Sequence, residues 1–596
     1  MDMHRRGVGG QRVGLWVVLG LVPWLVGAAA APGSPAEQLV GTWGSEQVLG
    51  PQVQGELTLV RGEGTWRARI SGFEVPARVS GKQVSVVLPG GQGELRGAWA
   101  GDGQAITGHW IQPRLWMSGM KFATPVVLRP LGADVWRGQV APLVDRYSLY
   151  LVVQKQPDGA VSAFIRNPER SFGSRLTFQV SLQGNAVRLT STSGKVNIEG
   201  TFDAREGLLS LRHPSLGMTF DFTRRDRNQA VGLYSRTPAT GAYVYQRPIQ
   251  EDDGWSTASL AEVGLDAKPI RQLVQRILDQ EPGPEPAPAI QGLLIARHGK
   301  LVVEEYYQGF DKERPHDLRS AAKSYASLLI GIALDQGAAF TVDTPVVSMF
   351  PEYKGRIANL DARKRKLTVA HLMTMSPGLA CDDDDPDSPG NEDRLEDDVP
   401  DWYKYTLDLP MTRAPGLGAV YCSANINLLG GVLRNATRMW IPEFFEKYVA
   451  TPLQMRGHHI NLMPSGEQYL GGGIYMRPRD ALKLGQLYLA RGVWNGRRVV
   501  SQGWVERSTA NQATMGDGRT YGYTWWRHEL RVGDKVYAQY EASGNGGQLV
   551  MVVPELDLVV MFTAANYNHV ALWRKFREDL LPRFILSAVS DDRVTP

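Results

Sequence analysis

Residues 38–248 are dominated by short runs in which apolar and polar residues alternate. Runs such as GELTLVR, TWRARISG, QVSVVLPG, SLYLVVQK and LTFQVSLQG are separated by Gly, Asn, Asp or Pro, at intervals of roughly ten residues. Because successive side chains of a strand point to opposite faces, each run can bury one face and expose the other. The pattern predicts an all-β sandwich or barrel.

This region divides into two β modules, which we place at residues 38–130 and 131–248. LVGTWGSEQ and RGAWAGDGQAITGHW open and close the first, and ADVWRGQV and IEGTFDAREGLLSL do the same in the second. This loose similarity indicates an internal duplication. Tryptophans of the modules could contact cell-envelope glycans, although Trp buried in a β core is the more common arrangement.

The chain contains two Ser-x-x-Lys patterns, and their surroundings distinguish them. Ser118 and Lys121 lie in the β-rich region, where residues three apart point to opposite sides of a strand. Ser320 and Lys323 begin a run with apolar residues at helical spacing, which stops at Gly337. A helix that begins near Ser320 places Lys323 one turn later on the same face. We therefore expect contact in the second pair and treat the first as coincidence.

A serine in contact with a lysine can become a nucleophile. A neutral lysine takes the hydroxyl proton, and burial is one way to keep a lysine neutral. The N-terminus of a helix also favours negative charge, so the backbone N–H of Ser320 could stabilise an oxyanion. From this pair alone, a helix-capping Ser320 beside a solvated Lys323 remains the alternative.

Further segments occur in a characteristic order around SAAK (residues 320–323). They are GLLIARHGKLVVEEYYQGF, LTVAHLMTMSPGL, PGLGAVYCSANINLLGGVL, GGGIYMRPRDALKLGQLYL and EASGNGGQLVMVV. Over about residues 255 to 590, the chain resembles the serine β-lactamase and penicillin-binding-protein superfamily, in particular class C β-lactamase-like esterases, D-aminopeptidases and 6-aminohexanoate-dimer hydrolases. The resemblance implies a multidomain chain in which the all-β modules precede an α/β catalytic domain at residues 249–596. That domain would have an antiparallel sheet with flanking helices and a helical subdomain.

The resemblance also implies roles for individual residues. Ser320 would be acylated by an ester or amide carbonyl, and Lys323 and Tyr421 would share the proton transfers, with either one as the base. Tyr421 as a core residue is the alternative. The family's Lys-Thr-Gly strand corresponds to Ala542–Gly544, which makes the backbone N–H of Asn545 the second oxyanion donor, or, in a shifted alignment, to Gly544–Gly546. Ser543 lies on the same strand.

Two departures from the family pattern bear on the substrate. Ser423 occupies the place of the asparagine in Tyr-x-Asn, although Asn425 and Asn427 follow closely, so hydrogen bonding to a substrate amide is altered. The Gly-rich strand has no lysine to hold a substrate carboxylate, which argues against penicillins. We expect a small ester, amide or peptide substrate. A D-amino-acid or linear-amide peptidase and a non-catalytic cell-envelope binding protein are the alternatives, and the presence of Ser320, Lys323 and Tyr421 favours an enzyme.

Other classes of function lack support in the sequence. The net charge is +4, from 65 basic and 61 acidic residues, and predicts no nucleic-acid partner. The chain has neither Gly-x-Ser-x-Gly nor His-Glu-x-x-His. His371, His458 and His459 have no acidic or cysteine partner at ligand spacing, and the acidic run at residues 381–401 fits a solvated loop better than a calcium loop. We expect neither a metal nor a cofactor.

The beginning of the chain resembles a signal peptide. Arg5, Arg6 and Arg12 precede a short apolar run that ends in Ala-rich sequence, so we expect cleavage after about residue 31 and a periplasmic or secreted protein, with an uncleaved anchor as the alternative. Cys381 and Cys422 are the two cysteines of the chain. In an oxidising compartment they can form a disulfide next to Tyr421; two separate thiols are the alternative.

Overall fold

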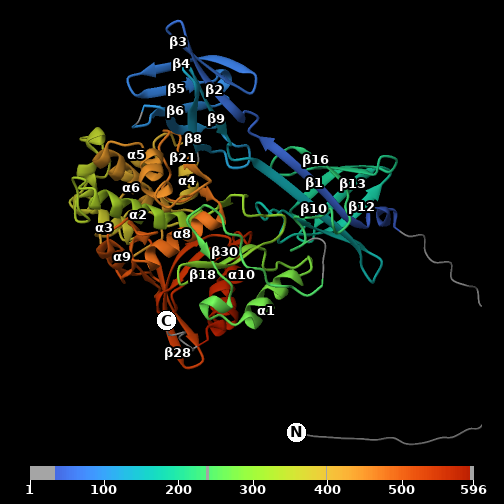
Figure 1. The fold of residues 1–596 in the computed structure, drawn as a ribbon. Helices are drawn as coiled ribbons and strands as arrows, with labels where there is room; N and C mark the ends of the chain where they lie inside the picture. The colour runs from blue at the N-terminus through green and yellow to red at the C-terminus, as the bar shows by residue number, and fades with distance from the viewer. Residues whose placement is uncertain (1–33, 102, 237–240, 397–398, 591–596) are drawn as a thin grey trace, which may run out of the picture.

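The computed structural model describes residues 34–101, 103–236, 241–396 and 399–590, and consists of two β units and a larger α/β domain (Figure 1). The expected signal peptide lies outside the described residues. Within them, none of the helices has the length and apolar character that crossing a bilayer requires.

The first β unit contains eight antiparallel strands that close on themselves, because β9 pairs with both β2 and β8. Trp110, Leu57 and Leu128 are fully buried in its core. The strands are β2 (Gly55–Gly62), β3 (Thr65–Ile70), β4 (Phe73–Ser80), β5 (Gln83–Val87), β6 (Glu94–Trp99), β7 (Ile106–Ile111), β8 (Lys121–Gly132) and β9 (Val135–Val140).

The second β unit is a closed eight-stranded barrel. Its core contains Trp43, whose indole N–H donates to the Leu39 carbonyl over 2.7 Å. The strands are β1 (Gly41–Gly50), β10 (Asp145–Lys155), β11 (Val161–Arg166), β12 (Thr177–Gln183), β13 (Ala186–Ser191), β14 (Asn197–Asp203), β15 (Leu208–Arg212) and β16 (Thr219–Arg224).

The two β units are nested in the sequence rather than consecutive. The first strand of the chain, β1, pairs with β10 and β16, so it completes the second unit, and Figure 1 shows it crossing to the barrel. The first unit is thus inserted between β1 and β10, and the expected boundary at residues 130/131 falls inside β8. Closure of the second barrel explains this arrangement. When β1 pairs with both β10 and β16, the barrel has no unpaired strand edges.

The first β unit is also joined to the α/β domain by a continuous sheet. Strand β21 (His458–Leu462) pairs with β8, and β22 (Ile474–Met476) and β20 (His316–Asp317) follow in the same sheet. Figure 1 shows β8 and β21 side by side where the two parts meet.

The α/β domain is built on a nine-stranded sheet in the order β17-β19-β18-β30-β29-β28-β27-β26-β25. All neighbours are antiparallel except β17 and β19. The strands are β17 (Ser256–Thr257), β18 (Ile290–Arg297), β19 (Lys300–Tyr306), β25 (Ala513–Thr514), β26 (Thr520–Tyr521), β27 (Trp526–Val532), β28 (Lys535–Gly544), β29 (Gln548–Val553) and β30 (Leu558–Ala564). A separate hairpin consists of β23 (Val493–Trp494) and β24 (Arg497–Arg498).

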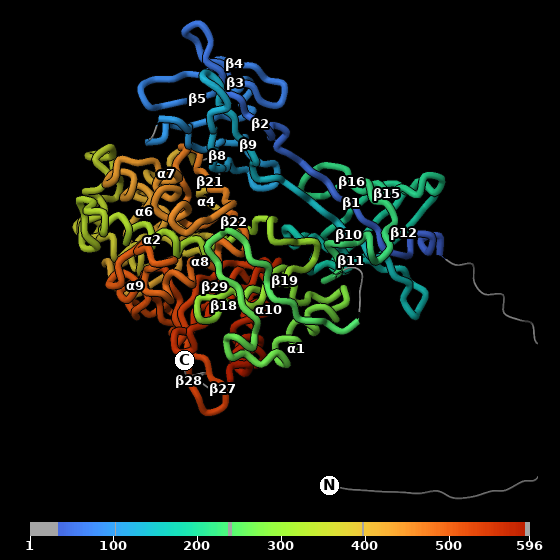
Figure 2. The backbone as a smooth tube through the Cα atoms, viewed as in Figure 1, coloured from blue at the N-terminus to red at the C-terminus, as the bar shows by residue number. Residues whose placement is uncertain are grey.

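Both faces of the central strands are buried, and alternate residues enter different cores. Leu293 and Phe562 pack with α1 (Ala267–Leu278) and the C-terminal π-helix η10 (Phe576–Ile585). Leu294 and Met561 pack on the other side, in the core that contains α2 (Lys323–Asp335), α6 (Ser423–Thr437) and α8 (Pro478–Leu489). Each fully buried side chain of this kind stabilises the fold by about 1.5–3 kcal/mol. The sheet is therefore the middle layer between two sets of helices (Figure 2).

Shorter helices complete the helical part of the domain. They are α3 (Val369–Met373), α4 (Glu392–Glu396), α5 (Trp402–Asp408), α7 (Ile441–Phe445), α9 (Gln502–Thr509) and α10 (Val570–Lys575). The expected fold class, all-β modules followed by an α/β domain with a helical subdomain, is confirmed.

Candidate active site

Ser320 lies in the 3₁₀ turn η4 (Arg319–Ala322), directly before α2. The helix ends at Asp335, just before Gly337, as its apolar spacing predicts. Arg319 has a φ of 48°, which is strained for a residue with a side chain. The Arg319 guanidinium pairs with Asp317 over 2.9 Å and lies over the Tyr567 ring. These contacts offset the backbone strain. The residue before the serine is therefore held by its surroundings, and the serine with it.

Lys323 is fully buried and contacts three oxygen atoms. Its Nζ lies 2.9 Å from the Ser320 Oγ and 2.8 Å from the Ser423 Oγ, and it also contacts the Gly471 carbonyl. Loss of hydration lowers the pKa of Lys323, while the nearby carboxylates of Glu392 and Asp383 oppose this change. The position therefore makes Lys323 easier to deprotonate than an exposed lysine.

Ser423 connects Lys323 to a carboxylate. Both the hydroxyl and the backbone N–H of Ser423 donate to Asp383 Oδ2 over 2.7 Å. Burial, together with the charge of Glu392, raises the pKa of Asp383 to about 6. Ser423 is fully buried, so its position differs from the substrate contact that its alignment with the family asparagine implied: it contacts the lysine instead.

Tyr421 approaches Ser320 from the segment before α6. Its hydroxyl interacts with the Ser320 side chain, and its ring lies 5.0 Å from the Lys323 Nζ. Trp526 of β27 also stacks on the ring, with centroids 5.8 Å apart and an angle of 18°. Burial raises the pKa of Tyr421 above its ordinary value, although the Ser320 side chain acts in the opposite direction. Tyr421 is thus a neutral phenol next to the serine.

Cys381 and Cys422 face each other with Cα atoms 5.7 Å apart, a separation typical of a disulfide pair. They bring together the segments that carry Asp383 and Tyr421. The two asparagines after Cys422 lie inside α6: Asn425 donates to the Cys422 carbonyl, and Asn427 accepts from the Leu470 N–H. Neither asparagine contacts Ser320.

The end of β28 lies against the turn that carries Ser320. A Cβ atom on Gly544 would lie 2.2 Å from the Leu318 carbonyl oxygen and 3.1 Å from the Ala321 nitrogen, so only glycine fits without movement. Gly546 has a φ of 96°, and a Cβ there would lie 2.8 Å from the Tyr567 ring. Asn545 lies between these glycines and exchanges two hydrogen bonds with Asn568.

Gly544→Ala is expected to displace the η4 turn. The added methyl group overlaps backbone atoms, so we expect a loss of about 1–3 kcal/mol in the free energy of unfolding, measured by urea denaturation. Gly503→Ala is the matched control, because a Cβ there meets nothing within 4 Å. If the two variants had equal free energies of unfolding, the close packing of β28 against the η4 turn would be excluded.

A cavity of about 350 Å³ is lined in part by Trp526, the residue that stacks on Tyr421. Trp526 and Ser543 line it together with Trp573, and Arg519 and Arg577 also contribute. Asp517 pairs with Arg519, and buried Glu541 pairs with Arg577. The cavity is therefore a polar space with an aromatic wall, and Ser320, Lys323 and Tyr421 are not among its lining residues.

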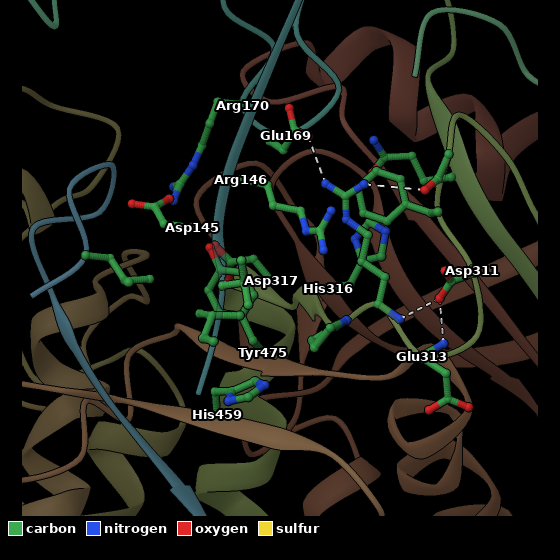
Figure 3. Close-up of a pocket in the computed structure, with 18 of the residues that line it drawn as sticks. Asp145, Arg146, Glu169, Arg170, Asp311, Glu313, His316, Asp317, His459 and Tyr475 are labelled. Carbon is green, nitrogen blue, oxygen red and sulfur yellow. Dashed lines mark hydrogen bonds and ion pairs between the residues drawn. The ribbon is translucent and has the colours of Figure 1, made fainter. Parts of the chain in front are cut away.

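A second cavity, of about 430 Å³, lies between the barrel and the α/β domain, and Ser320, Lys323 and Tyr421 are not among its lining residues. Figure 3 shows charged side chains from both parts facing each other across it. Glu169 of the barrel pairs there with Arg314 over 2.8 Å. These contacts fasten the barrel to the α/β domain.

Asp383 and Gly471 are the site residues that the sequence analysis missed. The acidic run was expected to be a solvated loop, which holds for residues 384–387, but Asp383 turns inward to Ser423. The cysteine pair is the sequence feature that could have identified Asp383, because pairing of Cys381 with Cys422 places Asp383 next to Ser423. Gly471 contributes only its backbone carbonyl, for which no side-chain pattern exists.

Comparison with known proteins places this arrangement in a family. The β-lactamase family model matches residues 270–573, just over half of the chain. The 6-aminohexanoate-dimer hydrolase of Paenarthrobacter ureafaciens is 27% identical over 291 residues, which are 45% of this chain and 70% of that protein.

Two solved structures are similar at lower identity. EstCE1, described as a hydrolase with promiscuous acyltransferase activity, is 17% identical with a TM-score of 0.42, over 53% of this chain and 97% of its own. A penicillin-binding-protein homologue from Caulobacter crescentus is 16% identical with a TM-score of 0.39, over 50% of this chain and 91% of its own. With the family match over residues 270–573, the chain belongs to the β-lactamase family and is a serine hydrolase.

Proposed function

We propose that this protein hydrolyses a small ester or linear amide through an acyl-enzyme on Ser320, with Lys323 as the general base. The observation that carries the proposal is the 2.9 Å contact between the Ser320 Oγ and the buried Lys323 Nζ. A serine needs a base within hydrogen-bond reach before it can attack a carbonyl.

The hydrogen bonds around Lys323 favour this role. A neutral amine has two N–H groups and one lone pair. The Gly471 carbonyl can accept one N–H, and the Ser423 hydroxyl, which gives its own proton to Asp383, can accept the other. The lone pair is then left for the Ser320 hydroxyl. Tyr421, whose pKa is raised, acts as a neutral proton relay rather than as the base.

The reaction proceeds in two balanced halves. The Ser320 proton moves to Lys323 as the Oγ attacks the carbonyl, and the backbone N–H groups of Ser320 and Asn545 donate hydrogen bonds to the oxyanion. The C–O or C–N bond then breaks, and the leaving group takes a proton from Lys323 through Tyr421. Water, deprotonated by the same pair, attacks the acyl-enzyme, and Ser320 recovers its proton as the acid leaves.

The cavity at Trp526, through its lining residues, supports an ester or linear amide over a penicillin. Its arginines are already paired with carboxylates, and the Gly-rich strand carries no lysine. A substrate carboxylate therefore lacks the free cation that fixes it in penicillin-hydrolysing relatives. The name of the curated relative, a 6-aminohexanoate-dimer hydrolase, points in the same direction.

A fluorophosphonate probe tests the proposal directly. We expect one adduct per chain, located on the peptide that contains Ser320. A panel of p-nitrophenyl esters, linear amides and a chromogenic cephalosporin should then give the highest kcat/KM for esters or linear amides. Absence of labelling in folded protein would favour the non-catalytic binding protein, and preferred hydrolysis of the cephalosporin would overturn the substrate class.

Tyr421→Phe should lower kcat by about 10²-fold, because it removes one proton-transfer group but keeps the ring that stacks on Trp526. KM should change little, since the aromatic wall is retained. Steady-state kinetics on the best ester separates the two parameters. Tyr523→Phe, whose hydroxyl lies outside this site, is the control; an unchanged kcat in Tyr421→Phe would exclude the relay.

Asp383→Asn should shift the acid limb of the kcat/KM profile to lower pH. The negative charge of Asp383 raises the pKa of Lys323 against the dominant effect of burial. Without that charge the ammonium form is less stable, so its pKa falls, and the neutral base persists at lower pH. The asparagine can still accept from Ser423, so the plateau should fall less than about tenfold.

Asp387→Asn, at an exposed position of the same loop, controls for the general loss of an acidic charge. Its pH profile should match that of the wild type. A limb that moves to higher pH in Asp383→Asn would contradict the assignment of Lys323 as the base.

We also propose that the protein is exported and that Cys381 and Cys422 form a disulfide. In an oxidising compartment, the bond between Cys381 and Cys422 would hold Asp383 and Tyr421 around Lys323. Non-reducing peptide mapping should show the two peptides linked, and N-terminal sequencing of protein from the periplasm or medium should begin near residue 32. Free thiols or an intact N-terminus would refute the corresponding part. Glycan contact by the β modules remains a prediction.

A further inference from the structure

Three ligand-bearing side chains meet where the first β unit joins the α/β domain. His109 lies on β7, His458 on β21, and Glu446 begins the π-helix η8 (Glu446–Ala450). One imidazole nitrogen of each histidine and one carboxylate oxygen lie within 4.8 Å of one another. The sequence analysis found no ligand partner for His458, because His109 is far away in the chain and is brought close only by the pairing of β21 with β8.

The two imidazoles are buried and lack hydrogen-bond partners in the described part of the chain. His109 is 1% exposed and His458 is 2% exposed, and neither ring nitrogen of either histidine makes a hydrogen bond. The inward-facing Oε2 of Glu446 makes none either, although it lies 3.4 Å from the Nε2 of His458. Buried polar atoms in folded proteins are almost always hydrogen-bonded, so a cluster of buried polar atoms without hydrogen bonds requires an explanation.

The surroundings orient these groups toward one another. Glu446 Oε1 accepts a hydrogen bond from the Thr451 hydroxyl over 3.0 Å, so the other oxygen turns inward. The Trp440 ring packs edge-on against His109 at 5.4 Å, and Phe445 packs against His458 at 5.1 Å. Side chains whose rotation is limited in this way are suited to hold a ligand.

The charges nearby permit a cation. Both imidazoles are buried, and a neutral imidazole offers a lone pair to a metal ion. Arg96 is the cation that acts on His109, but its guanidinium lies over Trp440 and 3.8 Å from Glu443. The acid Glu443 thus offsets the arginine.

We propose that His109, His458 and Glu446 bind one Zn²⁺ ion, with water as the fourth ligand. Two imidazole nitrogens and one carboxylate oxygen form a donor set that zinc uses in proteins, and atoms around a tetrahedral zinc lie about 3.3 Å apart, which small side-chain rotations can reach from the present geometry. The 34% exposure of the Glu446 side chain leaves a path for the ion. The metal would fasten the first β unit to the α/β domain, away from Ser320, and takes no part in hydrolysis.

The test uses the full-length protein, stripped with a chelator, dialysed and titrated with ZnCl₂ against a competing chromogenic chelator. We expect one equivalent per chain, a rise in Tm on adding zinc, and a Co²⁺ absorption spectrum typical of tetrahedral coordination. His109→Asn and His458→Asn should each abolish all three signals. His459→Asn is the matched control, because His459 is the adjacent buried residue on β21 but is hydrogen-bonded to Thr124 over 2.7 Å, and should keep the zinc.

Glu446→Gln covers the case in which the histidine variants fail to fold. Its side chain is partly exposed, and glutamine keeps an acceptor for Thr451, so we expect the variant to fold. Loss of a residue that only supports a metal ligand lowers metal affinity by roughly 10- to 100-fold. Because Glu446 would bind the zinc directly, we expect a larger loss of zinc affinity in this variant. Circular dichroism checks folding. Less than one equivalent in the wild type, or the same affinity in the wild type and Glu446→Gln, would overturn the site.

Discussion

Ser320→Ala is expected to abolish fluorophosphonate labelling and to lower kcat on any substrate by at least about 10⁴-fold. Alanine removes the attacking oxygen, while Lys323 and Tyr421 remain in place. The side chain of Ser320 is partly exposed and is hydrogen-bonded to Lys323, so the fold should survive. Intact mass after labelling and initial rates measure the two effects.

Ser118→Ala is the matched control, because Ser118 begins the second Ser-x-x-Lys pattern. Ser118 accepts a hydrogen bond from the Met120 N–H, and Lys121 begins β8, so the pattern there serves a turn. Labelling should be unchanged. Wild-type activity in Ser320→Ala would place the chemistry elsewhere, and the cavity of about 430 Å³ between the two parts would be searched next.

Lys323→Met is expected to lower kcat/KM by roughly 10²- to 10⁴-fold and to remove the dependence of the rate on lysine ionisation. Methionine fills a similar volume but cannot accept the Ser320 proton. In the wild type, the rate should rise with pH as Lys323 loses its proton, and the lowered pKa of this lysine places the rise below the range of an ordinary lysine. A pH series on one ester compares the two profiles.

Lys364→Met separates catalysis from the burial of a lysine. Lys364 is also buried, with its pKa lowered to about 8, but its Nζ donates to three backbone carbonyls, those of Ala358, Leu407 and Leu409. We expect this variant to lose stability but to keep the wild-type rate per folded molecule. An equal loss of rate in both variants would mean that Lys323 has a structural role.

Much of the fold followed from local patterns. The alternating runs of residues 38–248 became strands, because a period of two fixes which face of each strand is buried. The helix after Ser320 and the contact of Ser320 with Lys323 followed from three-residue spacing, which one helical turn enforces without help from the rest of the chain. The order of segments after residue 255 indicated the α/β domain.

Contacts between distant segments did not follow in the same way. The pattern of β1 shows that it is a strand, but any free edge could accept it, and only closure of the second barrel selects β10 and β16. Asp383 looks like its acidic neighbours, and only the approach of Cys381 to Cys422 turns it toward Ser423.

The sequence by itself therefore determined the strands, the α2 helix and the Ser320–Lys323 pair, since each depends on spacing within one element. Only the tertiary structure decided that Ser423 and Asp383 support the lysine, and that His109 faces His458 and Glu446. The physical reason is that a side chain's long-range partners depend on which strand edges and helix faces remain open when the elements pack together.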